Sequence, residues 1–414
     1  MKDEIISNID NPRKLEKLYR DHKAAFRKSF NLIYPDIQDS AAARIWNERL
    51  NFEGDDISWG TSREFVLVLL LSVVAAVIAK IPMLAGIRDN WYYPRNLGFV
   101  FLPALTVFFA WRQHLSARNI GIVATLMLLS AFYINMLPDS RNSDTLILSC
   151  IHLPLFTWTL LGFSFTGGRL ADSDRRLDFL RYNGDLVVMS ALIIISGGIL
   201  TGITIGMFSL IGLDIKDFYF DYIVACGAAA LPVIASWLVL NNPQLVNKVS
   251  PVIARIFTPL VLLTLVIYLG AVISTGKNPY NDREFLLIFN GLLIGVMAII
   301  FFSAAETSKK KPGKTEIVLL AALSVLTIIV NGIALSAIIF RIAEGGITPN
   351  RLAVLGGNLL MLANLLLVTG KLFKSIRQPE KIDSVGRSLV SFLPIYSIWT
   401  AVVVFILPIA FGFQ

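Results

Sequence analysis

The chain has 414 residues, of which 55% are hydrophobic and 16% are charged, and its formal net charge is +8. Soluble domains average about a quarter charged residues, so this composition excludes an ordinary soluble globular protein. Because the 37 Lys and Arg residues lie outside the longest apolar runs, the positive charge indicates membrane topology and not a nucleic-acid-binding surface.

Residues 1–62 are polar and are predicted to form a cytoplasmic helical domain without a signal peptide. Apolar residues in the stretch NPRKLEKLYRDHKAAFRKSFNLIYPD share one face of a helix, namely Leu15, Leu18, Phe26, Phe30 and Ile33. One interpretation is a partly amphipathic interfacial helix that lies on anionic lipid headgroups. The alternative is a small helical cap, with a second helix at 40–50, that packs on the cytoplasmic ends of the spans.

Residues 63–414 are predicted to form a multi-span transmembrane domain. Each apolar run, with its flanks, can cross about 30 Å of hydrocarbon as a helix. The eleven charge-free cores are 66–79, 98–110, 121–136, 146–164, 187–212, 223–239, 257–273, 286–303, 318–340, 353–369 and 389–411. The predicted fold class is therefore an all-α polytopic membrane protein with eleven transmembrane helices.

The distribution of Lys and Arg predicts the orientation. Basic residues concentrate in alternate loops, which places the N-terminus in the cytoplasm and the C-terminus outside, in the periplasm. Two aromatic clusters, at 90–96 and 217–222, are then predicted to be outer loops at headgroup level. The longest inner loop, 167–185, mixes Arg with Asp and predicts a solvated short helix.

The fifth run carries glycines four residues apart, at Gly198, Gly202 and Gly206. Such spacing favours close packing of another helix. The alternative is a glycine-lined face along a solute path.

Amide side chains occur where acids do not. Asn290, Asn331, Asn358 and Asn364 lie within apolar runs and can form hydrogen bonds between helices. They are interpreted as interhelical ties, with a polar cavity shared by the eighth to tenth helices as the alternative. The lack of acids in the apolar cores argues against ion-coupled transport, although Asp185 and other acids at span edges could turn inward.

The stretch FRIAEGGITPNR at 340–351 predicts a tight outer hairpin between the ninth and tenth helices. Gly345 or Gly346 can end the first helix. Thr348 suits the N-cap of the next helix and Pro349 its first position.

The same hairpin carries charge beside the membrane. Arg341 and Glu344 lie three residues apart and can pair. Arg351 falls in a first helical turn, where the helix dipole disfavours a cation, so a partner is predicted: Glu344, a buried carbonyl or an anionic ligand. The candidate polar or anion-binding cluster comprises Arg341, Glu344, Thr348, Asn350, Arg351 and Asn358.

Little in the chain suggests catalysis. There is no HExxH, GxSxG or P-loop motif, so no catalytic residue, metal or cofactor is predicted. His152 in the fourth run is interpreted as a hydrogen-bonded interior residue, with a ligand role as the alternative. Cys150 and Cys226 lie in apolar runs and are expected to pack as small hydrophobes.

The hairpin resembles a segment of a bacterial polytopic membrane family, domain-of-unknown-function family 4153. In that family an Arg-Ile-x-Glu stretch leads into Gly-hydrophobic-Thr-x-Asn-Arg. The chain has Gly345 where the family usually has an aromatic residue. The matching positions are Arg341, Ile342, Glu344, Gly346, Ile347, Thr348, Asn350 and Arg351. The resemblance implies a multi-pass bacterial membrane protein and supplies no activity.

Three hypotheses follow. The first is a bacterial inner-membrane protein of permease type for a small or lipid-like solute, in contact with the bilayer. The second is a scaffold or sensor that recruits a protein partner through its N-terminal helices. The third is a lipid-headgroup-modifying enzyme that uses Glu344 as a base and the arginines as phosphate clamps.

Overall fold

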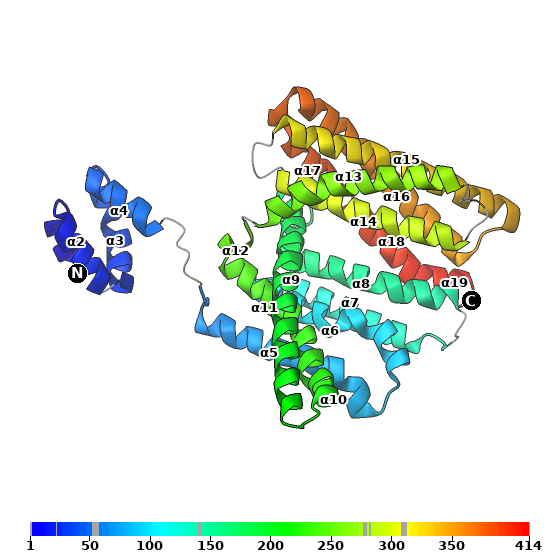
Figure 1. Ribbon diagram of the computed structural model, residues 1–414, viewed down its shortest axis with the longest axis horizontal. Coiled ribbons are helices and arrows are strands. Elements are labelled where there is room, and N and C mark those ends of the chain that lie inside the picture. The colour runs from blue at the N-terminus through cyan, green and yellow to red at the C-terminus, as the bar shows by residue number, and fades with distance from the viewer. Residues whose placement is uncertain are drawn as a thin grey trace. The chain divides into compact units, whose positions relative to one another are not determined.

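The computed structural model describes residues 2–21, 23–51, 58–139, 143–247, 249–275, 280, 283–307 and 313–413. The chain divides into two compact units, Met1–Ser58 and Trp59–Gln414. Within the described residues every regular element is a helix (Figure 1). The predicted all-α class is confirmed.

The smaller unit has its own core. The apolar residues that share one helix face, here called the apolar stripe, are buried and pack on Trp46 and Leu50 of the last helix. The buried members of the stripe are Leu15, Phe26, Phe30 and Ile33, and Leu18 is partly buried. The helices are α1 (Lys2–Ser7), α2 (Pro12–Asp21), α3 (Lys23–Ile37) and α4 (Ala41–Asn51). The stripe is therefore used inside the unit, where it packs against the second helix, and an interfacial position on anionic lipid stays a prediction.

Glu16 ties α2 to α4. Its carboxylate accepts a hydrogen bond from Arg20 Nε at 2.8 Å and lies 2.8 Å from Arg49 Nη1. The hydrogen bond from Arg20 holds the pKa of Glu16 below its usual value. A lowered carboxylate pKa contributes stability at neutral pH that is lost as the pH falls through the folded-state pKa. The contribution is small because the pair is on the surface.

The larger unit contains the apolar helices. In chain order they are α5 (Ser62–Ala85), α6 (Asp89–Arg112), α7 (Ala117–Met136), α8 (Asp144–Phe165), α9 (Ser173–Leu210), α10 (Lys216–Phe218), a π-helical turn (Tyr219–Val224), α11 (Ala225–Asn241), α12 (Gln244–Asn247), α13 (Val249–Thr275), α14 (Arg283–Thr307), α15 (Lys314–Gly345), α16 (Pro349–Arg377), a 3-10 turn (Pro379–Lys381), α17 (Asp383–Ser391), α18 (Leu393–Ala401), a π-helical turn (Val402–Ile406) and α19 (Leu407–Ala410).

Nine helical stretches in the described part of the chain are long and apolar enough to cross a membrane. The protein is therefore a multi-pass membrane protein, and the count of eleven is not confirmed. The two predicted runs that fall short are 98–110 and 286–303. The first lies in α6, whose opening turns carry Asp89 and Arg95, and the second begins outside the described side chains, which cover the apolar stretch Leu293–Glu306.

Two predicted outer loops are helical, and the short helix predicted in 167–185 is continuous with a longer one. The aromatic stretch 90–96 forms the first turns of α6, and 217–222 lies in α10 and the π-helical turn. Much of 167–185 belongs to α9, which begins at Ser173 and continues into the fifth apolar run.

The aromatic residues of α6 bind the backbone of α5. Pro82 has no N–H, so the carbonyl of Ile78 lacks its helical donor. The Tyr92 hydroxyl donates to this carbonyl at 2.9 Å, and the Tyr93 hydroxyl donates to the next one, at Ala79, also at 2.9 Å. The cluster at 90–96 therefore fastens two helices together.

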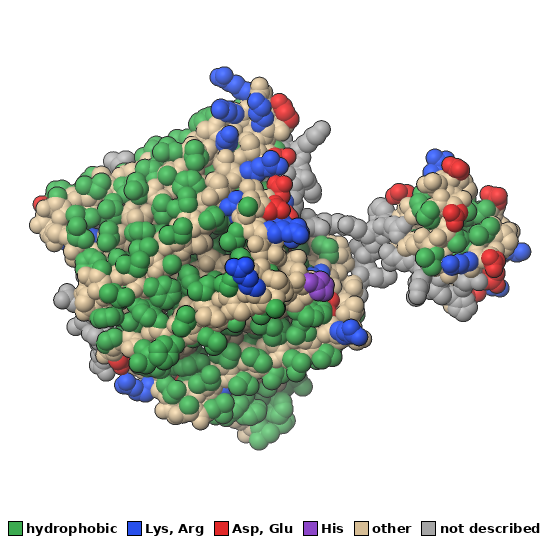
Figure 2. Space-filling view, turned by 180° about the vertical axis from the view of Figure 1, so that it is seen from behind, with side chains coloured by type: hydrophobic (Ala, Val, Ile, Leu, Met, Phe, Trp, Pro, Cys, Tyr) green, Lys and Arg blue, Asp and Glu red, His purple; other side chains and the backbone are tan. Residues whose placement is uncertain are grey.

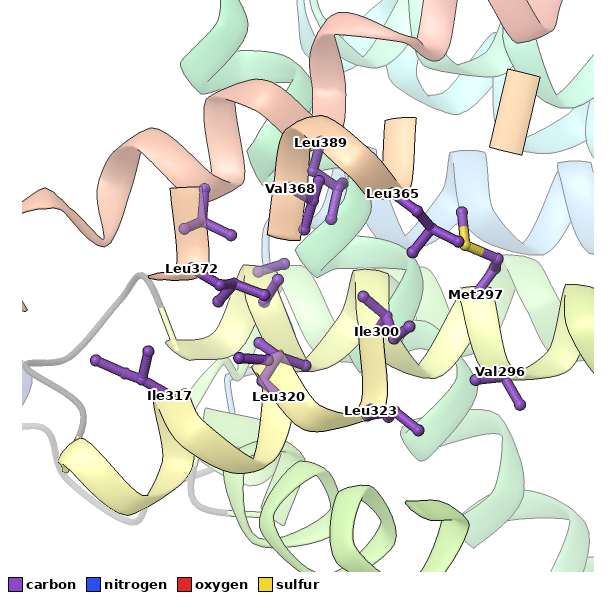
Figure 3. Close-up of a cluster of buried hydrophobic side chains, with 14 of the residues drawn as sticks. Val296, Met297, Ile300, Ile317, Leu320, Leu323, Leu365, Val368, Leu372 and Leu389 are labelled. Atoms are coloured by element: carbon purple, nitrogen blue, oxygen red, sulfur yellow. The ribbon is translucent and has the colours of Figure 1, made fainter. Parts of the chain in front are cut away.

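Two clusters of buried hydrophobic residues contribute most to the core of the larger unit. One lies among α13, α14, α15, α16 and α17 and buries Ile300, Leu320 and Leu365 (Figure 3). In α15 the core residues recur three apart, at 317, 320 and 323, and so share one face. The other core lies among α5, α6, α8, α9 and α11, around Phe108 and Phe109.

The outside of the larger unit is largely apolar. Figure 2 shows hydrophobic side chains over most of one face, with charged side chains gathered toward one border. Large apolar side chains along α9 are exposed, such as Ile199 and Leu200 at 60% and 61%. A surface of this kind suits contact with lipid tails.

The predicted packing glycines do not pack within this chain. No described atom lies within 4 Å of where a Cβ would stand on Gly198, Gly202 or Gly206. Close contacts occur at other glycines, including Gly184 against Phe302 and Gly356 against Trp399. No described helix of this chain packs on the α9 glycines, because this half of α9 faces outward, and their role in packing another helix stays a prediction.

Candidate functional site

The hairpin at 340–351 has the predicted backbone. α15 ends at Gly345, and Gly346 follows with φ 73° and donates its N–H to the Ile342 carbonyl at 2.9 Å. Thr348 is the N-cap of α16, where its hydroxyl accepts the Arg351 N–H at 3.3 Å, and Pro349 is the first helical residue. The stop, cap and restart read from the sequence are confirmed.

The charged side chains of this hairpin bind backbone carbonyls. Arg351 Nη1 donates to the Gly346 carbonyl at 2.7 Å, so the predicted partner is a carbonyl of the turn itself. Arg341 Nε donates to the Tyr280 carbonyl at 3.1 Å. Among the described residues no ion pair joins Arg341 to Glu344, so that predicted pair is absent. Both arginines are held by backbone carbonyls, so the contacts at this hairpin give no support to the base and phosphate clamp of the enzyme hypothesis.

Replacing Arg351 with alanine is expected to lower the free energy of unfolding by less than about 1 kcal/mol, because one hydrogen bond at an exposed turn is lost. Unfolding in detergent micelles measures this change, and Thr348→Ala, which removes the cap, serves as a comparison. A loss of solute flux in Arg351→Ala with unchanged stability would contradict this structural role.

The predicted amides tie helices together. Asn331 of α15 donates to the Asn358 carbonyl of α16 at 3.1 Å, and the Asn358 side chain donates to Asn290 Oδ1 of α14 at 2.7 Å. Asn364 donates to the Leu389 carbonyl at 3.4 Å and to the Tyr396 hydroxyl at 3.3 Å. Asn358 thus belongs to this chain of amides, while Arg351 belongs to the turn. Asn350 is half-buried beside the cap.

His152 interacts with its own helix. Its Nδ1 lies 2.9 Å from the Leu148 carbonyl, which agrees with an interior hydrogen-bonded histidine. Within the described ranges no group of three His, Cys, Asp or Glu side chains could hold a metal ion.

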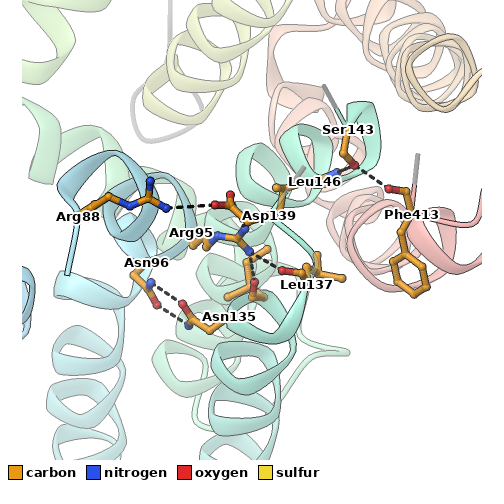
Figure 4. Close-up of polar contacts among 10 residues, drawn as sticks. Arg88, Arg95, Asn96, Asn135, Leu137, Asp139, Ser143, Leu146 and Phe413 are labelled. Atoms are coloured by element: carbon orange, nitrogen blue, oxygen red, sulfur yellow. Dashed lines mark hydrogen bonds and ion pairs between the residues drawn. The ribbon is translucent and has the colours of Figure 1, made fainter. Parts of the chain in front are cut away.

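A buried arginine near the predicted outer end was missed (Figure 4). The Arg95 side chain is 3% exposed, and its Nη1 donates to the Ile134 and Leu137 carbonyls at 2.8 and 3.1 Å. Its Nη2 lies 3.4 Å from Asp139. Next to it, Asn96 and Asn135 exchange two hydrogen bonds of 2.9 Å. The Arg95 guanidinium thus supplies hydrogen bonds to carbonyls at the C-terminal end of α7, where the helix dipole favours a cation.

Three acids among the described residues of the larger unit are buried, Glu64 in the first turn of α5, Asp185 within α9 and Glu306 in the last turn of α14. Glu64 is paired with Arg112, and Asp185 accepts a hydrogen bond from the Ser250 hydroxyl at 2.6 Å. Asp185 therefore turns inward, as the sequence allowed.

The larger unit contains a pocket of about 440 Å³. It lies where α7, α9 and α18 begin and α8 ends. Its walls are mainly apolar, and Ile122, Leu126 and Ile398 at the pocket are 45%, 38% and 66% exposed on the outside of the protein. Its other walls include Trp158, Leu160, Phe163, Phe179, Leu393 and Pro394. The pocket therefore borders the surface that contacts lipid.

Arg176 is the charged side chain among the described residues that line this pocket. It lies in the first turn of α9, and its Nη2 donates to the Ser173 hydroxyl at 3.0 Å. Its Nε is buried and has no hydrogen-bond partner among the residues that the structure describes. Sequence reasoning missed this residue because Asp172 is spaced to pair with either Arg175 or Arg176, and it pairs with Arg175 at 3.7 Å.

No protein-family model, curated protein or solved structure matches the chain. The pocket and its residues are therefore interpreted from their chemistry alone.

Proposed function

We propose that the protein is of permease type and takes a lipid-like solute from the bilayer into the pocket between α7, α8, α9 and α18. The observation that carries this proposal is the pocket itself, whose volume of about 440 Å³ lies in the range of small-molecule sites. Its apolar walls and exposed apolar side chains suit a hydrocarbon chain that enters sideways.

The proposal also includes the membrane, the orientation and the family of the protein. A bacterial inner membrane, a cytoplasmic N-terminus and membership of family 4153 are supported by the loop charges and the hairpin residues. In that orientation the pocket lies at the cytoplasmic ends of its helices.

Filling the pocket is expected to reduce transport. Leu126→Trp places an indole into the space between α7 and α18, so movement of a fluorescent phospholipid analogue across proteoliposomes should fall at least threefold, about 0.65 kcal/mol in barrier height. Leu128→Trp is the matched control, because Leu128 lies on the same helix, is 71% exposed and does not line the pocket. Equal flux in both variants, with both folded, would contradict the proposal.

A second candidate is recruitment of a protein partner. It is favoured by the compact unit Met1–Ser58, which has a core separate from the cores of the larger unit. Affinity purification with and without residues 1–58 tests it. An unchanged set of co-purifying proteins would count against recruitment.

A further inference from the structure

In the pocket the charged side chain of Arg176 lies among mainly apolar side chains. Three hydroxyl groups also line it, those of Thr159, Thr166 and Ser397, and each donates to a carbonyl of its own helix at 2.7, 3.1 and 2.8 Å. The hydroxyl protons are therefore already used. The buried Nε of Arg176 has no hydrogen-bond acceptor among the described residues.

Arg176 lacks the acid that its neighbours have. Arg175 pairs with Asp172, and Arg181 pairs with Asp178 at 2.8 Å. Asp174 pairs with Arg387 at 3.3 Å. Among the described residues no carboxylate lies within ion-pair distance of Arg176. A buried donor without an acceptor costs about 1–3 kcal/mol, and the first turn of α9 adds the positive end of a helix dipole. A bound anion would accept a hydrogen bond from the buried Nε and would also be stabilised by the positive end of the α9 dipole.

We infer that the pocket binds a bilayer phospholipid with a net negative headgroup, whose phosphate oxygens accept hydrogen bonds from Arg176 while one acyl chain lies along α7 and α18. This inference rests on the proposed function and names its substrate class. The planar guanidinium matches two phosphate oxygens at once. The polar end, at Arg176 and Thr166, and the apolar side chains Leu126 and Ile398 match the two ends of such a lipid.

The full-length protein in detergent tests the inference by native mass spectrometry. Phosphatidylglycerol and phosphatidylcholine with identical acyl chains are titrated separately. We expect tighter binding of phosphatidylglycerol, and an at least tenfold loss of that affinity in Arg176→Gln. Arg176→Lys should keep part of the affinity, because it retains the charge without the planar fork.

Arg169→Gln is the matched control, because it removes the same charge from an exposed arginine a few residues away that does not line the pocket. It should change the affinity less than twofold, which is within about 0.4 kcal/mol. Equal losses in Arg169→Gln and Arg176→Gln, or equal affinity of the wild type for the two lipids, would overturn the inference. A melting curve for each variant shows that it is folded.

The two proposals fail in different ways. If Leu126→Trp lowers flux while Arg176→Gln leaves lipid preference unchanged, the headgroup inference is overturned and the permease proposal stands. If Arg176→Gln abolishes the preference while Leu126→Trp leaves flux unchanged, the lipid is structural and the permease proposal falls.

Discussion

Replacing Arg95 with methionine is expected to lower the free energy of unfolding by about 3 kcal/mol, because two carbonyls at the buried end of α7 lose their donor. The Arg95 side chain is 3% exposed and donates to Ile134 and Leu137. Methionine has a similar reach and keeps much of the packing, so the change reports mainly the polar contacts. The contact with Asp139 contributes little, since that carboxylate is 54% exposed.

Arg88→Met provides the matched control. Arg88 lies 3.5 Å from the same Asp139 carboxylate, but its side chain is 68% exposed. Its loss should cost less than about 0.5 kcal/mol. Reversible unfolding in mixed micelles compares the two variants. Equal destabilisation would show that the carboxylate, and not the α7 carbonyls, is the partner that matters.

Arg95 also shows what the loop charges could not predict. Lys and Arg counts give the side of the membrane, and they treat every basic residue in a predicted loop alike. Arg95 stands in the first turns of α6 and closes the end of α7, some 40 residues away in sequence, at 134 and 137. Such a contact depends on which helices are neighbours. Hydrophobic runs do not encode that information.

Local signals predicted local structure well. At 340–351 the glycine stop, the Thr348 cap and the Pro349 start form as expected, because each depends on residues within one turn. The partner of Arg351 is also local, at Gly346. The apolar stripe of residues 15–33 was recognised, but its burial against α4 depends on a partner elsewhere in the chain.

The pocket could not be read from the sequence. Its walls come from four helices that are separated by long stretches of chain, and Ile122 and Ile398 are ordinary members of apolar runs. Arg176 looked like part of a solvated charged helix. Only the pairing of Asp172 with Arg175 leaves its neighbour without an acid.

Glycine spacing did not locate the close helix contacts within this chain. The same GxxxG pattern arises on a face that meets a helix and on one that meets lipid, because the pattern specifies only a groove of small residues. In α9 the groove at 198–206 meets no described atom of this chain. At Gly356, where no such pattern drew attention, a Cβ would stand 2.0 Å from Cζ2 of Trp399.

Gly356→Ala is therefore expected to lower the free energy of unfolding by about 2–3 kcal/mol, because the methyl group must displace the Trp399 ring between α16 and α18. Gly202→Ala is the matched control and should be neutral or stabilise by up to about 1 kcal/mol, since alanine favours a helix over glycine and no described atom of this chain occupies the space.

The double variant Gly356→Ala with Trp399→Leu isolates the contact. Removing the ring should return much of the stability that Gly356→Ala loses, and the coupling energy between the two positions should reach at least about 1 kcal/mol. Unfolding in mixed micelles measures all four members of the cycle. Additive losses would mean that Gly356 is needed for some reason other than room for the indole. A larger loss in Gly202→Ala than in Gly356→Ala would reverse the assignment of packing and place a helix from another molecule against α9.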